Sequence, residues 1–175
     1  MSELKYFFCK KLIILSMVAT ASTMAAQAIT VGGSDWTAPV TAITEAGNNY
    51  VGSTESINPA QITITGTIPI GLLSNAVRIS VSQNNVNWNS NLALAVRRTG
   101  NGSPCNNCVI EGNTLNEYTT VNQAASTSFM ILRIYGLLAG GTYSNIPVQV
   151  RLSGISVTVP SAAYQANIVF TISAL

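Results

Sequence analysis

The 175-residue sequence contains no histidine, and only 8% of its residues are charged. Without histidine the chain lacks the commonest general base and metal ligand, which excludes Ser-His-Asp and Cys-His catalytic arrangements. The low charge argues against nucleic-acid binding, because that function needs a dense basic surface. Phosphate-binding, dinucleotide-binding and calcium-binding motifs are missing as well. We therefore expect a protein that is not an enzyme and that binds no cofactor or metal.

The first 28 residues predict a secretory signal peptide. Lys10 and Lys11 close a basic region, residues 12–21 are mostly apolar, and Ala26 and Ala28 provide the small-x-small pattern of a cleavage site. Serines and threonines interrupt the apolar stretch before it reaches the roughly 20 residues of a spanning helix. We expect an exported chain without an integral membrane span, in the periplasm during transit and then at the cell surface or outside the cell.

Beyond residue 28 the chain contains no lysine, and its charges balance. Five arginines stand against five acidic residues: Arg78, Arg97, Arg98, Arg133 and Arg151 against Asp35, Glu45, Glu55, Glu111 and Glu117. The formal net charge of +2 therefore belongs to residues 1–28. Uncharged polar groups cost less to desolvate than charged ones, so this composition suits close contact between copies.

The remaining chain has the pattern of an all-β domain. Apolar and polar residues alternate in runs at residues 61–68, 76–82, 92–96, 148–152, 155–159 and 164–172, with turn-forming residues between them. Residues 128–138 are more continuously apolar, as in a strand that is covered on both sides or bulged. Strands that recur about every dozen residues, without helical spacing between them, favour an antiparallel sandwich over residues 47–175.

Cys9 lies in the predicted signal peptide, so two cysteines, Cys105 and Cys108, remain in the exported chain. In an oxidising compartment such a close pair predicts a disulfide, here a small staple on a polar loop. A redox site is less favoured, because Pro104 precedes the pair and a strand-like stretch follows it. Zinc binding would need further ligands.

Residues 29–46 precede the predicted sandwich and permit two interpretations. Ile29 and Val31 alternate with polar residues, and after two glycines the apolar positions shift to Trp36 and Val40. Pro39 argues against a central strand, because proline cannot donate to the hydrogen-bond ladder. The segment is either the first edge strand of the domain or an extension whose strand pairs with another copy.

Residues 159–172 resemble the closing strand of bacterial fimbrial subunits. A proline, small residues, Tyr164 and an alternating strand with Ile168, Phe170 and Ile172 follow one another as in that family. Together with the predicted signal peptide and the uncharged β composition, the chain resembles pilins of the chaperone–usher class. The resemblance implies an immunoglobulin-like sandwich of about seven to nine strands that lacks one strand and is completed by donor-strand exchange.

The resemblance also implies a structural subunit of a surface fibre that contributes to adhesion or biofilm formation. Its partners would be copies of itself or related subunits, a periplasmic chaperone and an outer-membrane usher. The donor strand would present four apolar side chains, Ile29, Val31, Trp36 and Val40. The groove that receives it would be lined by Tyr164, Ile168, Phe170 and Ile172.

The alternative function is that of a secreted, monomeric binding module for carbohydrate. Such sandwiches stack sugar rings on exposed aromatic side chains, and Trp88, in a polar stretch, and Tyr50 are the candidates. Trp88 can also be explained as a cover over the edge of the core, because tryptophan is highly buried on average.

Overall fold

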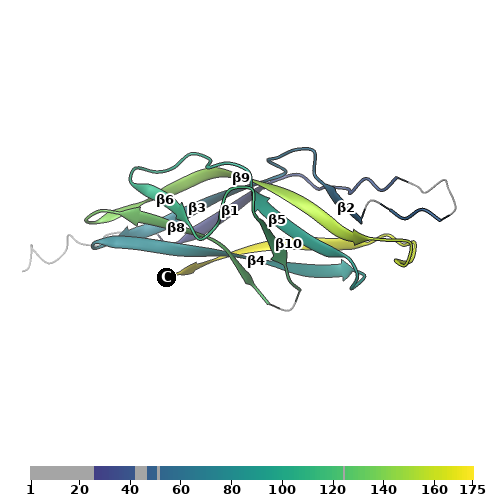
Figure 1. Cartoon of the computed structure of the whole chain (residues 1–175). Helices are drawn as coiled ribbons and strands as arrows, with labels where there is room; N and C mark the ends of the chain where they lie inside the picture. Colours follow the sequence, from purple (N-terminus) through teal and green to yellow (C-terminus); the bar gives the residue numbers. More distant parts are fainter. Residues whose placement is uncertain (1–25, 42–46, 51, 124) are drawn as a thin grey trace, which may run out of the picture.

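The computed structural model describes residues 26–41, 47–50, 52–123 and 125–175, and this part of the chain forms ten strands and no helix (Figure 1). The strands are β1 (Ala28–Gly33), β2 (Gly52–Glu55), β3 (Ile62–Gly71), β4 (Ser74–Asn87), β5 (Ala93–Arg98), β6 (Cys108–Glu111), β7 (Tyr118–Val121), β8 (Thr127–Tyr135), β9 (Ala139–Ile155) and β10 (Gln165–Ala174). Most of the predicted signal peptide lies outside the described residues, as do residues 42–46. Within the described ranges, no helix is long and apolar enough to cross a membrane.

The strands form two antiparallel sheets that share one core, which confirms the predicted all-β sandwich. The larger sheet has the order β1-β3-β9-β5-β7, with β2 also paired to β9, and the smaller sheet has the order β10-β4-β8-β6. Ten strands exceed the expected seven to nine, because β2, β6 and β7 are short strands of four residues each. The edge strands β1 and β10 belong to different sheets and contact each other.

Alternation of side chains explains how the sheets share a core. In β3, Ile64 and Ile68 are fully buried, while the threonines between them are only partly buried. In β4, Val77 and Ile79 are fully buried on one face, and Arg78 between them points to solvent. Each such buried aliphatic side chain stabilises the fold by roughly 1.5–3 kcal/mol. The apolar runs at 61–68 and 76–82 are therefore confirmed as strands with one face in the core.

Two predicted strand boundaries are wrong. β8 ends at Tyr135 rather than near residue 138, because Gly136, Leu137 and Leu138 form an exposed turn to β9. The run at residues 155–159 is not a separate strand, because β9 continues through Ile155 and Val157 lies exposed in the loop that follows. In both places apolar side chains occupy turns, where apolar character does not report burial.

The two ends of the sandwich are formed by different turns and loops (Figure 1). At one end, the β3–β4 and β8–β9 turns each carry the chain from one sheet to the other. They lie side by side, because the amides of Gly136 and Leu138 donate to the carbonyls of Leu73 and Leu72, each at 3.1 Å. At the opposite end lie the β4–β5 turn and the β9–β10 loop. The 17-residue strand β9 connects the two ends.

Candidate functional site

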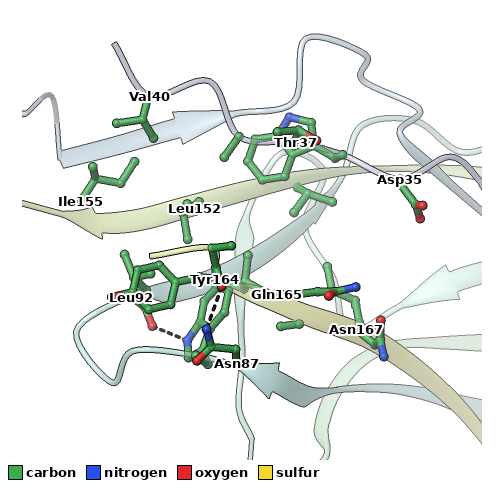
Figure 2. A pocket seen from close by; sticks show the side chains of 18 of the residues that line it. Asp35, Thr37, Val40, Asn87, Leu92, Leu152, Ile155, Tyr164, Gln165 and Asn167 are labelled. Atoms are coloured by element: carbon green, nitrogen blue, oxygen red, sulfur yellow. Dashed lines mark hydrogen bonds between the residues drawn. The ribbon is translucent and has the colours of Figure 1, made fainter. Parts of the chain in front are cut away.

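A cleft of about 1170 Å³ opens between the sheets at the end with the β4–β5 turn and the β9–β10 loop (Figure 2). Its walls are the segment 31–40, the second half of β9, the turn before β5, and residues 159–168. Figure 2 shows Val40, Leu92 and Leu152 around the same hollow. Among the described lining residues Asp35 alone is charged, and it is exposed. Apolar and amide groups therefore dominate the surface of the cleft.

Four aromatic side chains line the cleft, and all are half-buried: Trp36, Tyr50, Trp88 and Tyr164. The indole N–H of Trp88 donates to the carbonyl of Leu92 at 3.0 Å. The hydroxyl of Tyr164 donates to the carbonyl of Pro160 at 2.6 Å. These bonds hold both rings against their own loops. Trp88 packs against the core, as in the cover over the core edge considered from the sequence, and it also borders the cleft, where stacking on a sugar ring stays a prediction.

Amide side chains fix both walls of the cleft. Gln61, only 8% exposed, donates its side-chain NH₂ to the carbonyl of Ser34 at 2.8 Å and to the Ser34 hydroxyl at 3.0 Å. On the opposite wall, the side-chain NH₂ of Asn87 donates to the carbonyl of Ala163 at 2.7 Å. The segment after β1 is thus tied to the residue before β3, and the loop before β10 is tied to the last residue of β4.

The structure places the predicted donor-strand residues along their own domain. Ile29 is half-buried in β1, which pairs with β3 of the same chain as an edge strand. Trp36 is half-buried and, like Ile29, packs against the core. Val31 and Val40 are 45% and 50% exposed and border the cleft. This arrangement corresponds to the first-edge-strand interpretation of the segment.

The predicted groove residues share one face of the terminal region. Phe170 is 7% exposed and its ring centroid lies 5.9 Å from that of Phe129. Ile168 and Ile172 are half-buried and pack against the same core, while Tyr164 lies just before β10. Of the four, Tyr164 and Ile168 line the cleft, and Phe170 and Ile172 continue into the closed part of the sandwich.

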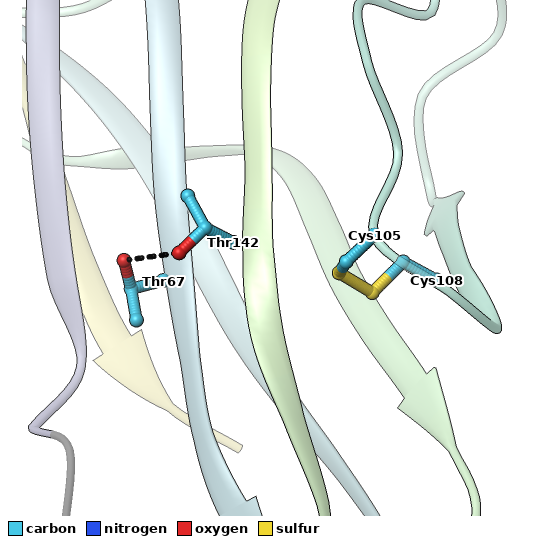
Figure 3. The surroundings of a disulfide bond; sticks show 4 residues. All are labelled: Thr67, Cys105, Cys108 and Thr142. Carbon is cyan, nitrogen blue, oxygen red and sulfur yellow. Dashed lines mark hydrogen bonds between the residues drawn. A yellow bond between two sulfur atoms is a disulfide. The ribbon is translucent and has the colours of Figure 1, made fainter.

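Cys105 and Cys108 form the predicted disulfide, with their Cα atoms 5.2 Å apart (Figure 3). Its setting differs from the expected polar loop, because Cys108 is only 9% exposed and both cysteines belong to or pack against the core. A Cβ added at Gly141 of β9 would lie 2.9 Å from the Cys105 sulfur. Glycine at this position leaves the room that the disulfide occupies. Figure 3 also shows the 3.2 Å hydrogen bond between Thr67 and Thr142 on the polar face.

A second cluster, on the larger sheet, was not predicted. The guanidinium groups of Arg97 and Arg151 lie 4.7 Å and 3.8 Å from the ring centroid of Tyr118. Arg97 also pairs with Glu55 at 3.2 Å. Burial, helped by the Glu55 carboxylate, raises the pKa of Tyr118 to about 12. The cluster joins β2, β5, β7 and β9, so it could be recognised only once the strand order was known.

Among the residues that the structure describes, no group of three or more His, Cys, Asp or Glu side chains is placed to hold a metal ion. The cleft offers binding chemistry through aromatic faces, aliphatic side chains and amides. No family model, no curated protein and no solved structure matches this chain.

Proposed function

We propose that the chain is an exported structural subunit of a bacterial surface fibre, assembled by exchange of its N-terminal segment between copies. The observation that supports this most directly is the weak attachment of β1. β1 has one neighbouring strand in its sheet, β3, and of its six residues only Ile29 is partly buried. The strand therefore contributes hydrogen bonds to an edge and little to the core.

Exchange would keep the hydrogen bonds of β1 and change only which copy supplies them. Residues 28–33 pair with residues 62–67 in antiparallel register. The same residues of a neighbouring copy would cover the same edge and link each copy to the next. Residues 29–34 have no charged side chain, so exchange would not place like-charged side chains opposite each other on this edge. A chaperone and an usher would be the partners during export, as in the class of pilins that the chain resembles.

An engineered disulfide tests the exchange. Thr30 and Thr65 are direct partners across β1 and β3, so variants Thr30→Cys and Thr65→Cys are purified separately, mixed and oxidised. Strand exchange should give a disulfide-linked dimer of the two variants, and the double variant should give a covalent ladder. A mixture of Thr30→Cys with Thr120→Cys, an exposed position on β7 at the opposite edge of the same sheet, is the control and should stay monomeric. If the double variant gives only monomers with an internal disulfide, the proposal is wrong.

Deletion of residues 29–46 gives an independent test. Unboiled samples of the secreted chain should run as a ladder in SDS, and the deletion should remove that ladder. A single monomer band with and without the deletion would contradict assembly by strand exchange.

A second candidate function, binding of carbohydrate, is favoured by the composition of the cleft. Tyr50, Trp88 and Tyr164 line it together with the amides of Gln165 and Asn167. Aromatic faces can stack on sugar rings, while amides can donate and accept hydrogen bonds with hydroxyl groups. The monomeric chain would then be the functional form.

Tryptophan fluorescence during titration with a panel of oligosaccharides tests this second candidate. A saturable change should occur with the monomeric chain and should weaken at least tenfold in the Gln165→Ala variant. Gln123→Ala, an exposed residue that does not line the cleft, is the matched control. A response that is equal in both variants would assign the signal to a place other than the cleft.

A further inference from the structure

Exposed aliphatic side chains gather where the β3–β4 and β8–β9 turns lie side by side. We call this cluster the leucine tip and define it by Ile70, Leu72, Leu73, Leu137 and Leu138. The four leucines are between 63% and 75% exposed, and Ile70 is 51% exposed. The backbone bonds that join the two turns hold these side chains together. Several hundred Å² of contiguous apolar surface is the size that marks an interaction site on a soluble domain.

Leu138 is unfavourable for the monomer in two ways, because its apolar side chain is exposed and its backbone has a positive φ. Four residues other than glycine in the described ranges have a positive φ, and three of them are asparagines, the side chain that tolerates this conformation. The fourth is Leu138, with φ 52°. A bulky residue in the left-handed region at a solvent-exposed turn does not help the monomer. Such an outlier is typical of a functional position.

We propose that the leucine tip docks into the cleft of a second copy, so that subunits join head to tail. This inference rests on the proposed assembly and specifies the contact between neighbouring subunits. The cleft is apolar along Val40, Leu92 and Leu152, and its volume of about 1170 Å³ exceeds the roughly 300–1,000 Å³ of small-molecule pockets. It therefore has room for several leucine side chains.

The leucine tip and the cleft are also compatible in charge. Neither surface has a charged side chain that docking would bury without a partner. The leucine tip consists of aliphatic residues, and the adjoining Arg133 and Glu111 neutralise each other at 2.9 Å. In the cleft, Asp35 is exposed and would stay in water. A lipid surface is the less suitable partner, because basic side chains strengthen the attraction to anionic headgroups and the chain has no lysine beyond residue 28.

The positions of the two surfaces determine the kind of assembly. They lie at opposite ends of the sandwich (Figure 1), so their contact is heterologous and leaves a free tip and a free cleft for further copies.

A variant that relieves the backbone strain at Leu138 distinguishes an effect on assembly from an effect on folding. The Leu138→Gly variant should melt at or above the temperature of the wild-type monomer, because glycine adopts this backbone without strain. Its assembly, followed by light scattering and sedimentation, should require at least a tenfold higher concentration. Asn145→Gly, another exposed left-handed position with φ 55°, is the matched control and should assemble normally. Assembly of Leu138→Gly at wild-type concentrations would overturn the inference.

Complementary charges identify the cleft as the receiving surface. Leu137→Asp and Ala162→Lys should each fail to assemble alone, and an equal mixture should form pairs through the new Asp–Lys contact. If the mixture does not recover, or if wild-type chain floats with phosphatidylcholine vesicles through the leucine tip instead, the cleft is not its partner.

Cross-linking between Thr30→Cys and Thr65→Cys that is unaffected by Leu138→Gly would overturn this inference alone. Absence of cross-links in the wild-type background would overturn the proposed function.

Discussion

The side-chain amide of Gln61 donates to the carbonyl oxygen of Ser34 at 2.8 Å, and the backbone amide of Ser34 donates back to the carbonyl of Gln61 at 3.3 Å. This reciprocal pair lies at the point where β1 ends and the segment along the cleft begins. It is the main polar tie between the N-terminal segment and β3 beyond the strand pairing itself. The attachment of this end of β1 therefore depends in part on the side chain of Gln61.

Replacement of Gln61 by alanine should loosen β1. The variant loses the side-chain bonds to the carbonyl and hydroxyl of Ser34 but keeps the backbone bond, and because Gln61 is buried we expect a loss of about 1–3 kcal/mol in the free energy of unfolding. Hydrogen exchange at the amides of β1 should accelerate, and cross-linking between copies should become faster. Gln123→Ala, at an exposed position, should change stability by less than about 0.5 kcal/mol. Unchanged exchange in β1 would show that Gln61 does not hold the segment.

Gly33→Ala should displace β1 through a clash with the same residue. Gly33 has φ 128°, and an added Cβ would lie 2.3 Å from the carbonyl oxygen of Gln61. We expect a loss of more than about 1 kcal/mol, measured by urea unfolding. Gly47→Ala is the matched control, since Gly47 also has a positive φ but no atom within 4 Å of the added Cβ. Equal losses in the two variants would assign the effect to backbone strain alone.

Arg98→Met should destabilise the loops on both sides of the disulfide. Arg98 is 6% exposed, and its guanidinium donates to the side chain and carbonyl of Asn113, to the carbonyl of Gly100 and to the side chain of Asn101. Loss of these bonds should cost about 2–3 kcal/mol. Arg78→Met, on an exposed face of β4, should be nearly neutral in the same denaturation experiment.

Stability should fall at alkaline pH because of Tyr118. Its pKa is raised to about 12 in the folded chain, while a tyrosine in the unfolded chain titrates near 10. Between these values the folded state holds a proton that the unfolded state has lost, so stability is constant below pH 10 and declines as pH rises from 10 to 12. Tyr118→Phe should reduce this decline in urea unfolding at pH 9 and 11. Burial also raises the pKa of Tyr143, so Tyr143→Phe should remove a further part of the decline in stability at alkaline pH, separate from that of Tyr118. An unaltered decline in Tyr118→Phe would contradict the assignment.

Removal of the disulfide should weaken the fold without abolishing it. The loop between Cys105 and Cys108 is very short, so its closure contributes only about 2 kcal/mol by the chain-entropy relation. Thermal unfolding of a Cys105→Ala/Cys108→Ala variant should show a lower melting temperature and the same β-sheet spectrum. Failure of the variant to accumulate would mean that the contact of Cys108 with the core matters more than the loop closure.

The sequence alone predicts the strands in which apolar and polar side chains alternate and the apolar side chains pack against the shared core. Ile62 and Ile64, or Ile168 and Phe170, are two residues apart, and burial on one face follows directly from that spacing. Leu137 and Leu138 extend the apolar run of β8 and thereby predict a longer strand, but both side chains are exposed in the turn that follows β8. The cleft and the cluster around Tyr118 depend on which strands are neighbours, and residue spacing along the chain does not carry that information.

The length of β9 has a mechanical consequence. This strand connects the leucine tip to the cleft end, with β3 beside it over residues 139–148 and β5 beside it over residues 148–153. Ladder hydrogen bonds are perpendicular to their strands, so a pull along a head-to-tail fibre loads these ladders in shear and all their bonds resist together. Under such a pull the domain should therefore stay folded until many ladder bonds break together.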